Sequence, residues 1–248
     1  RPVADALSRE LKQPIVVENR AGAGGALGIG VASRAPADGY TVLLSLSSIS
    51  ILPEADKILD RKPAYQLNQF KPIARFTADP TVLAVRAESP WKTAKELIDD
   101  MKARPGQISV ATAGVTSAGH NAMDFIVKAT GVKYRHVTYD GGNPAVVATV
   151  AGEAEVTTQL AVEQADMIRG KRLRPLATVS DKPLELEGYG TIPPLSQTLP
   201  GFTAPANYFG IFIPKGVPDE VVKTVEKIWA EQIPKSEALR KYATSRGA

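Results

Sequence analysis

The residues of this sequence that could do chemistry are small polar groups at predicted loop–helix junctions. Gly114–Gly119 (GVTSAG) lies between a predicted strand and a predicted helix, with the G-x-x-x-x-G spacing of a phosphate-binding loop. His120 and Asn121 stand where that motif needs a lysine and then a serine or threonine. Without the lysine the phosphates have no cation, and without the hydroxyl a magnesium ion has no ligand. The loop therefore argues against a nucleotide hydrolase.

A more general anion site remains in this loop. Backbone N–H groups at the start of a helix, together with the hydroxyls of Thr112, Thr116 and Ser117, can hold a carboxylate or another small anion. The alternative is an ordinary well-capped helix. Asp140–Pro144 (DGGNP) is a second such helix start, for which a ligand role and a capped turn are equally open. Ser45–Ser48 (SLSS) supplies a third polar loop after a predicted strand.

The spacing around Ser117 does not fit a serine hydrolase. A serine-hydrolase elbow needs G-x-S-x-G, and Gly114 lies one residue too far from Ser117. No acid is evidently placed to orient His120, and His136 is most simply a packed histidine in a strand.

Gly22–Gly28 (GAGGALG) approaches the dinucleotide fingerprint but lacks the acidic residue at the end of the next strand. It is better interpreted as a tight glycine-rich turn.

Composition excludes further chemistry. The 248 residues contain no cysteine and two histidines, so thiolate metal sites, iron–sulfur clusters, disulfides and cysteine nucleophiles are absent from this sequence. The net charge of +4 arises from 30 basic and 26 acidic residues in alternation, which does not favour nucleic acid. No run reaches the length of a membrane span. We expect no metal, no cofactor and no catalysis.

Strands alternate with helices along most of the chain, which predicts α/β architecture with largely parallel sheets. β-branched or apolar runs predict strands, each near a turn signal; they are 14–17, 40–46, 76–85, 108–112, 134–139, 155–160, 174–178 and 209–213. Thr93 and Glu96 have capping-box spacing at the start of a predicted helix. Gly131, Gly152 and Gly170 end the helices that follow, and Asn143 is the expected cap of the one that begins at Pro144.

The sequence resembles the solute-binding receptors of bacterial tripartite tricarboxylate transporters, the Bug family. The resemblance rests on five segments that occur in order and with family-like spacing: Ile15–Gly25, Ala35–Thr41, Tyr139–Ala145, Lys171–Ala177 and Phe209–Gly216. It implies a two-lobed periplasmic binding protein (type II, Venus-flytrap) with mixed, largely parallel sheets. Lobe 1 is expected to comprise residues 1–78 and 212–248, and lobe 2 residues 79–211.

The resemblance also implies a binding site for an organic carboxylate, a di- or aromatic carboxylate above all. Carried over position by position, the ligand-binding residues are Ser47, Ser48, Thr112, Ala113, Gly114, Ser117, His120, Gln159 and Tyr208. Two positions depart from the family pattern. Thr116 stands where the family commonly has glycine, and Gln159 where it often has aspartate, which replaces a charged acceptor by an amide that can also donate.

The implied setting is the periplasm, with delivery of the solute to a membrane permease by a receptor that we expect to be monomeric. Family members usually begin with a strand and a proline–glycine-rich loop, and continue beyond the point where this sequence ends. We therefore expect a chain without its export signal, first strand and C-terminal end. The alternative functions are an α/β enzyme that acts on a phosphorylated or nucleotide substrate through the Gly114 loop, and the sensory module of a regulator.

Overall fold

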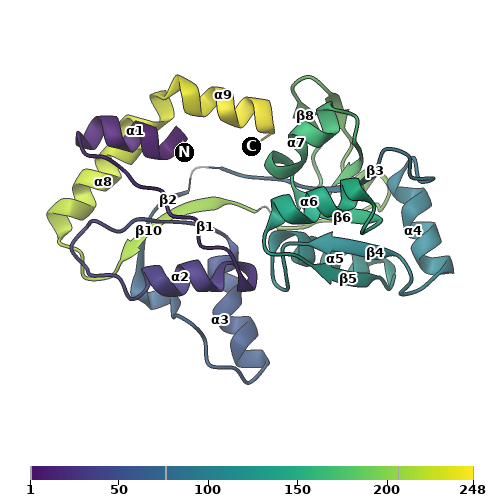
Figure 1. Cartoon of the computed structure of the whole chain (residues 1–248), viewed down its shortest axis with the longest axis horizontal. Helices are drawn as coiled ribbons and strands as arrows, with labels where there is room; N and C mark the ends of the chain where they lie inside the picture. The colour runs from purple at the N-terminus through teal and green to yellow at the C-terminus, as the bar shows by residue number, and fades with distance from the viewer. Residues whose placement is uncertain (1, 76, 206, 248) are drawn as a thin grey trace. The chain divides into compact units, whose positions relative to one another are not determined.

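The chain folds into two units, each with its own β-sheet and its own apolar core (Figure 1). The computed structural model describes residues 2–75, 77–205 and 207–247. Unit 1 comprises Arg1–Thr77 and Tyr208–Thr244, and unit 2 comprises Ala78–Asn207 and Ser245–Ala248.

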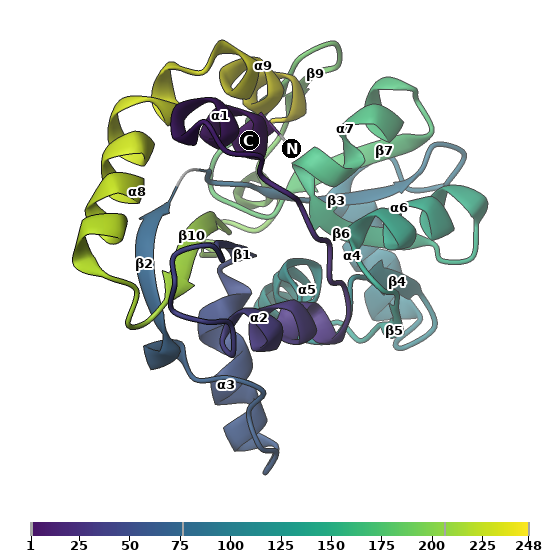
Figure 2. The ribbon, with the colours of Figure 1, turned by 60° about the vertical axis from the view of Figure 1, so that its left-hand side comes forward.

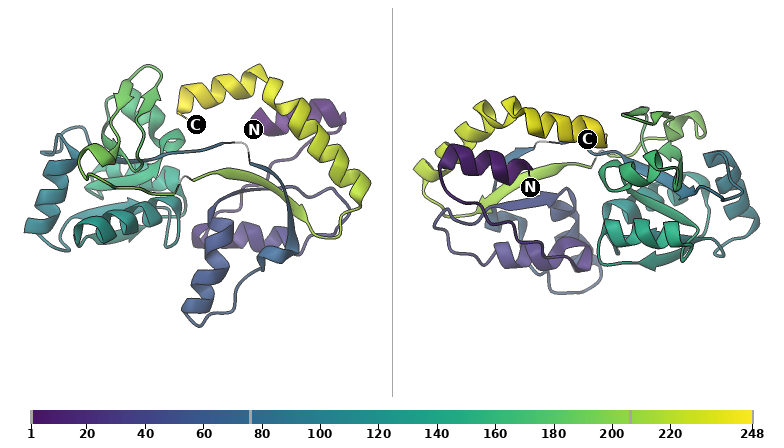
Figure 3. Two further views of the ribbon diagram at one scale, coloured as in Figure 1. Left: turned by 180° about the vertical axis from the view of Figure 1, so that it is seen from behind. Right: turned by 45° about the horizontal axis from the view of Figure 1, so that its top comes forward.

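Unit 1 is built on a three-stranded antiparallel sheet in the order β1-β10-β2. Its strands are β1 (Leu43–Leu46), β2 (Phe70–Arg75) and β10 (Phe209–Pro214). Its helices are α1 (Pro2–Leu11), η1 (Ala23–Gly25), α2 (Ala26–Ala32), α3 (Ser48–Ile58), η2 (Leu67–Gln69), α8 (Asp219–Glu231), η4 (Ile233–Lys235) and α9 (Glu237–Arg246). Helix α8 runs alongside β2 (Figure 3). Leu7, Ile211 and Trp229 join α1 and α8 to the sheet in one cluster, and Ile29, Ile49 and Phe212 join α2 and α3 to it in another.

Unit 2 contains a five-stranded sheet in the order β5-β4-β6-β3-β7 and a small hairpin of β8 and β9. The strands are β3 (Thr81–Arg86), β4 (Ser109–Thr112), β5 (Arg135–Thr138), β6 (Val156–Leu160), β7 (Leu173–Thr178), β8 (Leu184–Leu186) and β9 (Gly190–Ile192). The helices are α4 (Ala94–Ala103), α5 (Ala118–Thr130), α6 (Gly142–Ala151), α7 (Ala161–Arg169) and η3 (Leu195–Gln197).

Helices cover both faces of the five-stranded sheet (Figure 2). On one face α4 and α5 bury Leu97, Met123 and Ile126 against Leu83 and Val110. On the other face α6 and α7 join a second cluster with the alternate residues of β3. Because successive side chains of a strand point to opposite faces, a sheet that is covered on both sides buries every residue of β4 and β6, and every residue of β3 except Arg86 at its end.

The predicted capping box at the start of α4 is confirmed. The Thr93 hydroxyl accepts the Glu96 N–H at 3.2 Å, and the Glu96 carboxylate accepts the Thr93 N–H at 3.3 Å. The predicted glycine ends are also confirmed, since Gly131 and Gly152 lie at the ends of α5 and α6 in the left-handed conformation.

Of two strand predictions near the N-terminus, one is wrong and the other is confirmed with a later start. Residues 14–17 form no strand, and Val16 is 83% exposed. The run from Tyr40 becomes a strand at Leu43 instead of Tyr40, and Tyr40 is 91% exposed. These residues do not extend the sheet because a strand needs a partner. β1 is an edge strand that bonds to β10 on one side, and no described strand lies on its other side. In the predicted strand 76–85, β3 begins at Thr81, and Phe76 lies outside the described residues.

The glycine-rich stretch after residue 20 is a tight turn, as expected. Gly22, Gly24 and Gly25 all have positive φ, and α2 follows them. A Cβ on Gly28 would lie 2.9 Å from the Arg20 carbonyl oxygen, so the helix approaches the preceding segment too closely for a side chain.

The sheets are mixed, but the expectation that they are largely parallel is wrong. Among the described strands, β4 pairs in parallel with β5 and β6, and the remaining pairs are antiparallel. Parallel neighbours need a crossover connection, which the run β4–α5–β5–α6–β6 provides. Strands β3 and β10 instead enter their sheets where the chain passes from one unit to the other, so no crossover helix dictates their direction.

The boundaries of the units can be compared with the predicted lobes of 1–78 with 212–248, and 79–211. The structure places residue 78 and Ser245–Ala248 in unit 2, and residues 208–211 in unit 1. Residues 208–211 belong to unit 1 because β10 pairs with β1 from Phe209 onward.

The α4 cap yields the first prediction. T93A removes the acceptor for the Glu96 N–H and should lower the free energy of unfolding by about 1 kcal/mol. T203A is the matched control, because Thr203 is exposed, and should change stability by less than about 0.5 kcal/mol. Urea unfolding measures both, and equal stability of the two variants would contradict the assigned cap.

Candidate functional site

Three helices of unit 2 begin at one end of the five-stranded sheet. Strands β5 and β6 both run parallel to β4, so the carboxyl ends of the three strands lie together. Helix α5 follows β4, α6 follows β5, and α7 follows β6 directly. We call this end of the sheet the carboxyl edge. Positive helix ends converge there, which favours a ligand with a negative charge.

The start of α5 provides the donors that the sequence indicated. Helix α5 begins at Ala118, and Ser117 caps it by accepting the His120 N–H at 3.3 Å. The N–H groups of Ala118 and Gly119 have no acceptor in the described part of the chain. Gly114 (φ +108°) and Thr116 (φ +64°) shape the loop ahead of the helix. Thr116 thus takes the left-handed conformation that glycine favours, which fits the family's usual glycine at this position.

The hydroxyl of Thr112 holds the loop. Thr112 is fully buried, and its Oγ1 donates to the Gly114 carbonyl and accepts the Gly114 N–H, both at 3.3 Å. The same oxygen lies 2.5 Å from Nε2 of His136. Ala113, next to it, is partly buried. Thr112 therefore acts on the conformation of the loop.

The two histidines stack on each other beside this loop. Their ring centroids are 4.5 Å apart and the planes differ by 21°. His120 Nδ1 accepts the Thr116 N–H at 3.3 Å and lies 3.4 Å from the Asp124 carboxylate, while Tyr134 meets His136 edge-on. Burial lowers the pKa of His136, the neighbouring His120 lowers it further, and Asp124 opposes the shift.

Gln159 and Gly119 bring the end of β6 against the start of α5. A Cβ on Gly119 would lie 1.8 Å from the Thr158 carbonyl oxygen and 3.0 Å from the Gln159 side-chain nitrogen. Thr158 also donates its hydroxyl to the Gly119 carbonyl at 2.9 Å. Gln159 is 2% exposed, and its Nε2 has no hydrogen-bond partner in the described structure. An unpartnered buried donor next to the first turn of α5 is a second feature suited to an acceptor group on a ligand.

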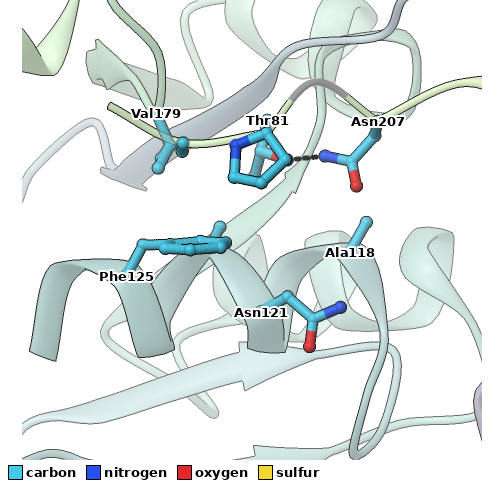
Figure 4. Close-up of a pocket in the computed structure, with 9 residues that line it drawn as sticks. Thr81, Ala118, Asn121, Phe125, Val179 and Asn207 are labelled. Carbon is cyan, nitrogen blue, oxygen red and sulfur yellow. Dashed lines mark hydrogen bonds between the residues drawn. The ribbon is translucent and has the colours of Figure 1, made fainter. Parts of the chain in front are cut away.

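A small cavity lies beside the first turns of α5, where Ala118, Asn121 and Phe125 form part of its lining (Figure 4). Asn121 and Phe125 of α5 face Thr81 and Asn207 across it, and Asn207 donates its side-chain N–H to the Thr81 hydroxyl at 2.9 Å. Its volume of about 20 Å³ can hold a water molecule but not a carboxylate ligand. Thr81, Asn121 and Asn207 were not among the predicted site residues, because nothing in their spacing brings three distant segments together.

The remaining predicted residues lie in unit 1. The N–H of Ser47 donates to the Tyr208 carbonyl at 3.0 Å, which joins the start of α3 to the start of β10. The Arg75 guanidinium lies 5.8 Å from the centre of the Tyr208 ring. Ser48 is buried in the first turn of α3. The structure thus gathers Ser47, Ser48 and Tyr208 in unit 1, and the other six predicted residues in unit 2.

The start of α6 differs from its prediction. Gly141 is the N-cap, so Asn143 and Pro144 lie within the first turn, and the expectation that Asn143 caps the helix is wrong. The chain turns at Gly141 with φ +118°, which places the cap position two residues earlier than Asn143. A carboxylate from another helix, that of Glu163 in α7, lies against Gly142. Glu163 was not among the predicted site residues, although a glutamate in the first turn of a helix is a usable signal.

Among the described residues, no three histidine, cysteine, aspartate or glutamate side chains come together in a way that would hold a metal ion. Within the same part of the chain, no helix is both long enough and apolar enough to cross a membrane.

Comparison with solved structures identifies the class of fold. The periplasmic binding protein BugD is 26% identical and superposes with a TM-score of 0.87 over 100% of this chain and 81% of that chain. MatC from Rhodopseudomonas palustris, solved with bound malate, has the same fold, with 24% identity and a TM-score of 0.86 over 100% of this chain and 82% of that one. The fold is that of a two-lobed periplasmic solute-binding protein.

The sequence comparisons identify the family. The model of the "Tripartite tricarboxylate transporter family receptor" matches residues 1–245. A protein of Pseudomonas sp. (strain P51), described as "UPF0065 protein in tcbD-tcbE intergenic region", is 32% identical over 225 residues. Those residues make up 90% of this chain and 65% of that protein, so the chain spans slightly less than two thirds of this relative. The chain belongs to the tripartite tricarboxylate transporter receptor family, of the Bug type.

The contact between Gly119 and β6 predicts a cost for any side chain at this position. G119A forces a methyl group onto the Thr158 carbonyl and should lower the free energy of unfolding by about 2 kcal/mol. G30A is the matched control, since a Cβ on Gly30 of α2 meets its neighbours at an ordinary 3.5 Å. Urea unfolding should separate the two variants. If G119A is as stable as G30A, the close approach is not a constraint.

The lowered pKa of His136 predicts that the folded chain loses stability in acid. Its pKa in the folded chain lies below the ordinary value, so the unfolded chain takes up a proton at higher pH than the folded one. The contribution of the neutral imidazole to stability is present above about pH 6.5, and it is lost as the pH falls from that value through the lower pKa of the folded chain. H136Q should therefore lose less stability than the wild type between pH 7.5 and pH 5.5, measured by urea unfolding at each pH. Identical pH slopes would show that His136 is not the group responsible.

Proposed function

We propose that this chain captures an organic carboxylate and that its negative group binds at the start of α5. The observation that carries the proposal is the set of donors at this helix start: the N–H groups of Ala118 and Gly119 and the hydroxyl of Ser117. A lone pair of the Ser117 hydroxyl accepts from His120, which leaves its hydrogen to donate. Hydrogen bonds to a charged acceptor are stronger than neutral ones, and the helix dipole favours the same charge.

The other predicted contacts extend this proposal. Gln159 offers an amide donor next to Gly119, while Thr112, Ala113, Gly114 and His120 shape the wall of the loop. Ser47, Ser48 and Tyr208 are the proposed contacts from unit 1. The solute would be an organic carboxylate, handed on to a membrane permease by a monomeric receptor in the periplasm, without chemical change. The family assignment supports this role, because the family is described as a transporter receptor.

The enzyme alternative has no comparable support. The Gly114 loop carries no lysine or magnesium-binding hydroxyl at the required positions, and the hydroxyl of Thr112 is engaged within the loop. His120 is near Asp124, but the distance is 3.4 Å and its Nδ1 already accepts the Thr116 N–H. This arrangement positions the loop and leaves Ser117 without a general base.

A thermal-shift panel of succinate, malate, adipate, benzoate and citrate tests the proposal. A true ligand at 100 times its Kd should stabilise the folded chain by about 2.7 kcal/mol. S117A should weaken binding by about tenfold or more, because it removes a hydrogen bond to a charged group. Calorimetric titration measures that loss.

T93A is the matched control for S117A. Both variants lose a helix cap in unit 2, but α4 begins after β3, and β3 ends at the opposite end of the sheet from the carboxyl edge. T93A should therefore bind the ligand as the wild type does. The proposal fails if no carboxylate raises the melting temperature, or if T93A and S117A lose affinity equally.

A further inference from the structure

Glu163 places a carboxylate at the start of a helix to which it does not belong. It is the third residue of α7, and its Oε2 accepts the Leu160 N–H at 3.3 Å. A Cβ built on Gly142 would lie 2.1 Å from Oε1 and 2.2 Å from Cδ and Oε2 of Glu163. The carboxylate therefore lies directly on the first turn of α6, and only a glycine at position 142 leaves room for it.

The N-cap and the first turn of α6 contain no acidic side chain of their own. Its N-cap is Gly141, which has no side chain, and Pro144 in the first turn has no N–H. Glu163 supplies the charge that favours the positive end of this helix. No basic side chain forms an ion pair with Glu163 in the described part of the chain, and Asp79 adds a charge of the same sign nearby.

The surroundings of Glu163 also affect its ionisation. Burial raises the pKa of Glu163 to about 7, Asp79 acts in the same direction, and the Leu160 N–H opposes the shift. Above pH 7 the carboxyl group is mostly ionised, so a second anion brought to α6 would meet a negative charge.

The starts of α5 and α6 at the carboxyl edge therefore differ in their charge and in their free hydrogen-bond donors. The start of α5 has free N–H donors and a hydroxyl, whereas the start of α6 is covered by an internal carboxylate. We propose that Glu163 is a specificity-determining residue, which occupies the position at α6 that a second ligand carboxylate would need and so favours ligands with one carboxylate at this edge. This inference rests on the proposed function, because it assumes that the first carboxylate binds at α5.

A purely structural role for Glu163 predicts something different. If the residue only caps α7 through the Leu160 N–H, its replacement lowers stability and changes the affinities for mono- and dicarboxylates equally. If it excludes a second carboxylate, its replacement changes the ratio of the two affinities. The ratio is therefore the informative measurement.

The experiment compares acids of equal chain length at pH 8 by isothermal titration calorimetry. Hexanoate is paired with adipate, and butanoate with succinate. In E163Q the affinity for each dicarboxylate should rise at least tenfold relative to its monocarboxylate, whose own affinity should change less than twofold. E187Q is the matched control, since it removes one acidic charge from an exposed position in unit 2 and should leave both ratios unchanged.

E163A provides a second route to the same result. It removes the bulk of the Glu163 carboxylate as well as its charge and leaves Gly142 unchanged, so the ratio should again rise even if E163Q does not fold. The inference is overturned if both ratios stay within twofold of the wild type in the folded variants, or if these variants bind neither adipate nor succinate. Failure of the proposed function is distinct, because then the wild type binds no carboxylate of the thermal-shift panel.

Discussion

The close approach of α5 to β6 is the contact on which the carboxyl edge of unit 2 depends. Gly119 lies so near the Thr158 carbonyl that no side chain fits between them, and the Thr158 hydroxyl bonds back to Gly119. This contact fixes the first turn of α5 against the sheet. The N–H groups of Ala118 and Gly119 and the hydroxyl of Ser117 are therefore held in place by a rigid helix. Gln159, on strand β6, lies beside them. Preorganised donors lose less entropy when they bind a ligand.

The first turns of α5 and α6 at this edge contain no lysine or arginine. Backbone N–H groups and hydroxyls provide the positive potential for a ligand, and Glu163 provides a negative charge over the adjacent helix. In the proposed function, the neutral donors bind one carboxylate and the internal carboxylate restricts where a second one can bind. The net charge of +4 of the whole chain contributes little to such a local pattern.

Local signals predicted the helices of unit 2 and strand β10 of unit 1 well, but they failed for the first predicted strand of unit 1. The Thr93–Glu96 capping box and the glycines at 131 and 152 fix helix ends through contacts within a few residues, so the sequence alone identifies them. The β-branched run 14–17 forms no strand, because a strand needs a partner and the described chain places none beside it. The expectation of parallel sheets failed for the same reason, since strand direction depends on connections between distant segments.

The sequence by itself determined that this is an α/β chain without cysteine chemistry, with an anion-suited loop at residues 112–120 and a family resemblance along most of its length. Only the tertiary structure decided which donors in that loop are free. It joined Thr112 to His136, stacked the two histidines, and brought Gln159 to Gly119. It also placed Glu163 on Gly142, twenty-one residues away in the chain. Capping and periodicity act within a turn of helix, whereas these contacts arise from the order in which β4, β5 and β6 pair.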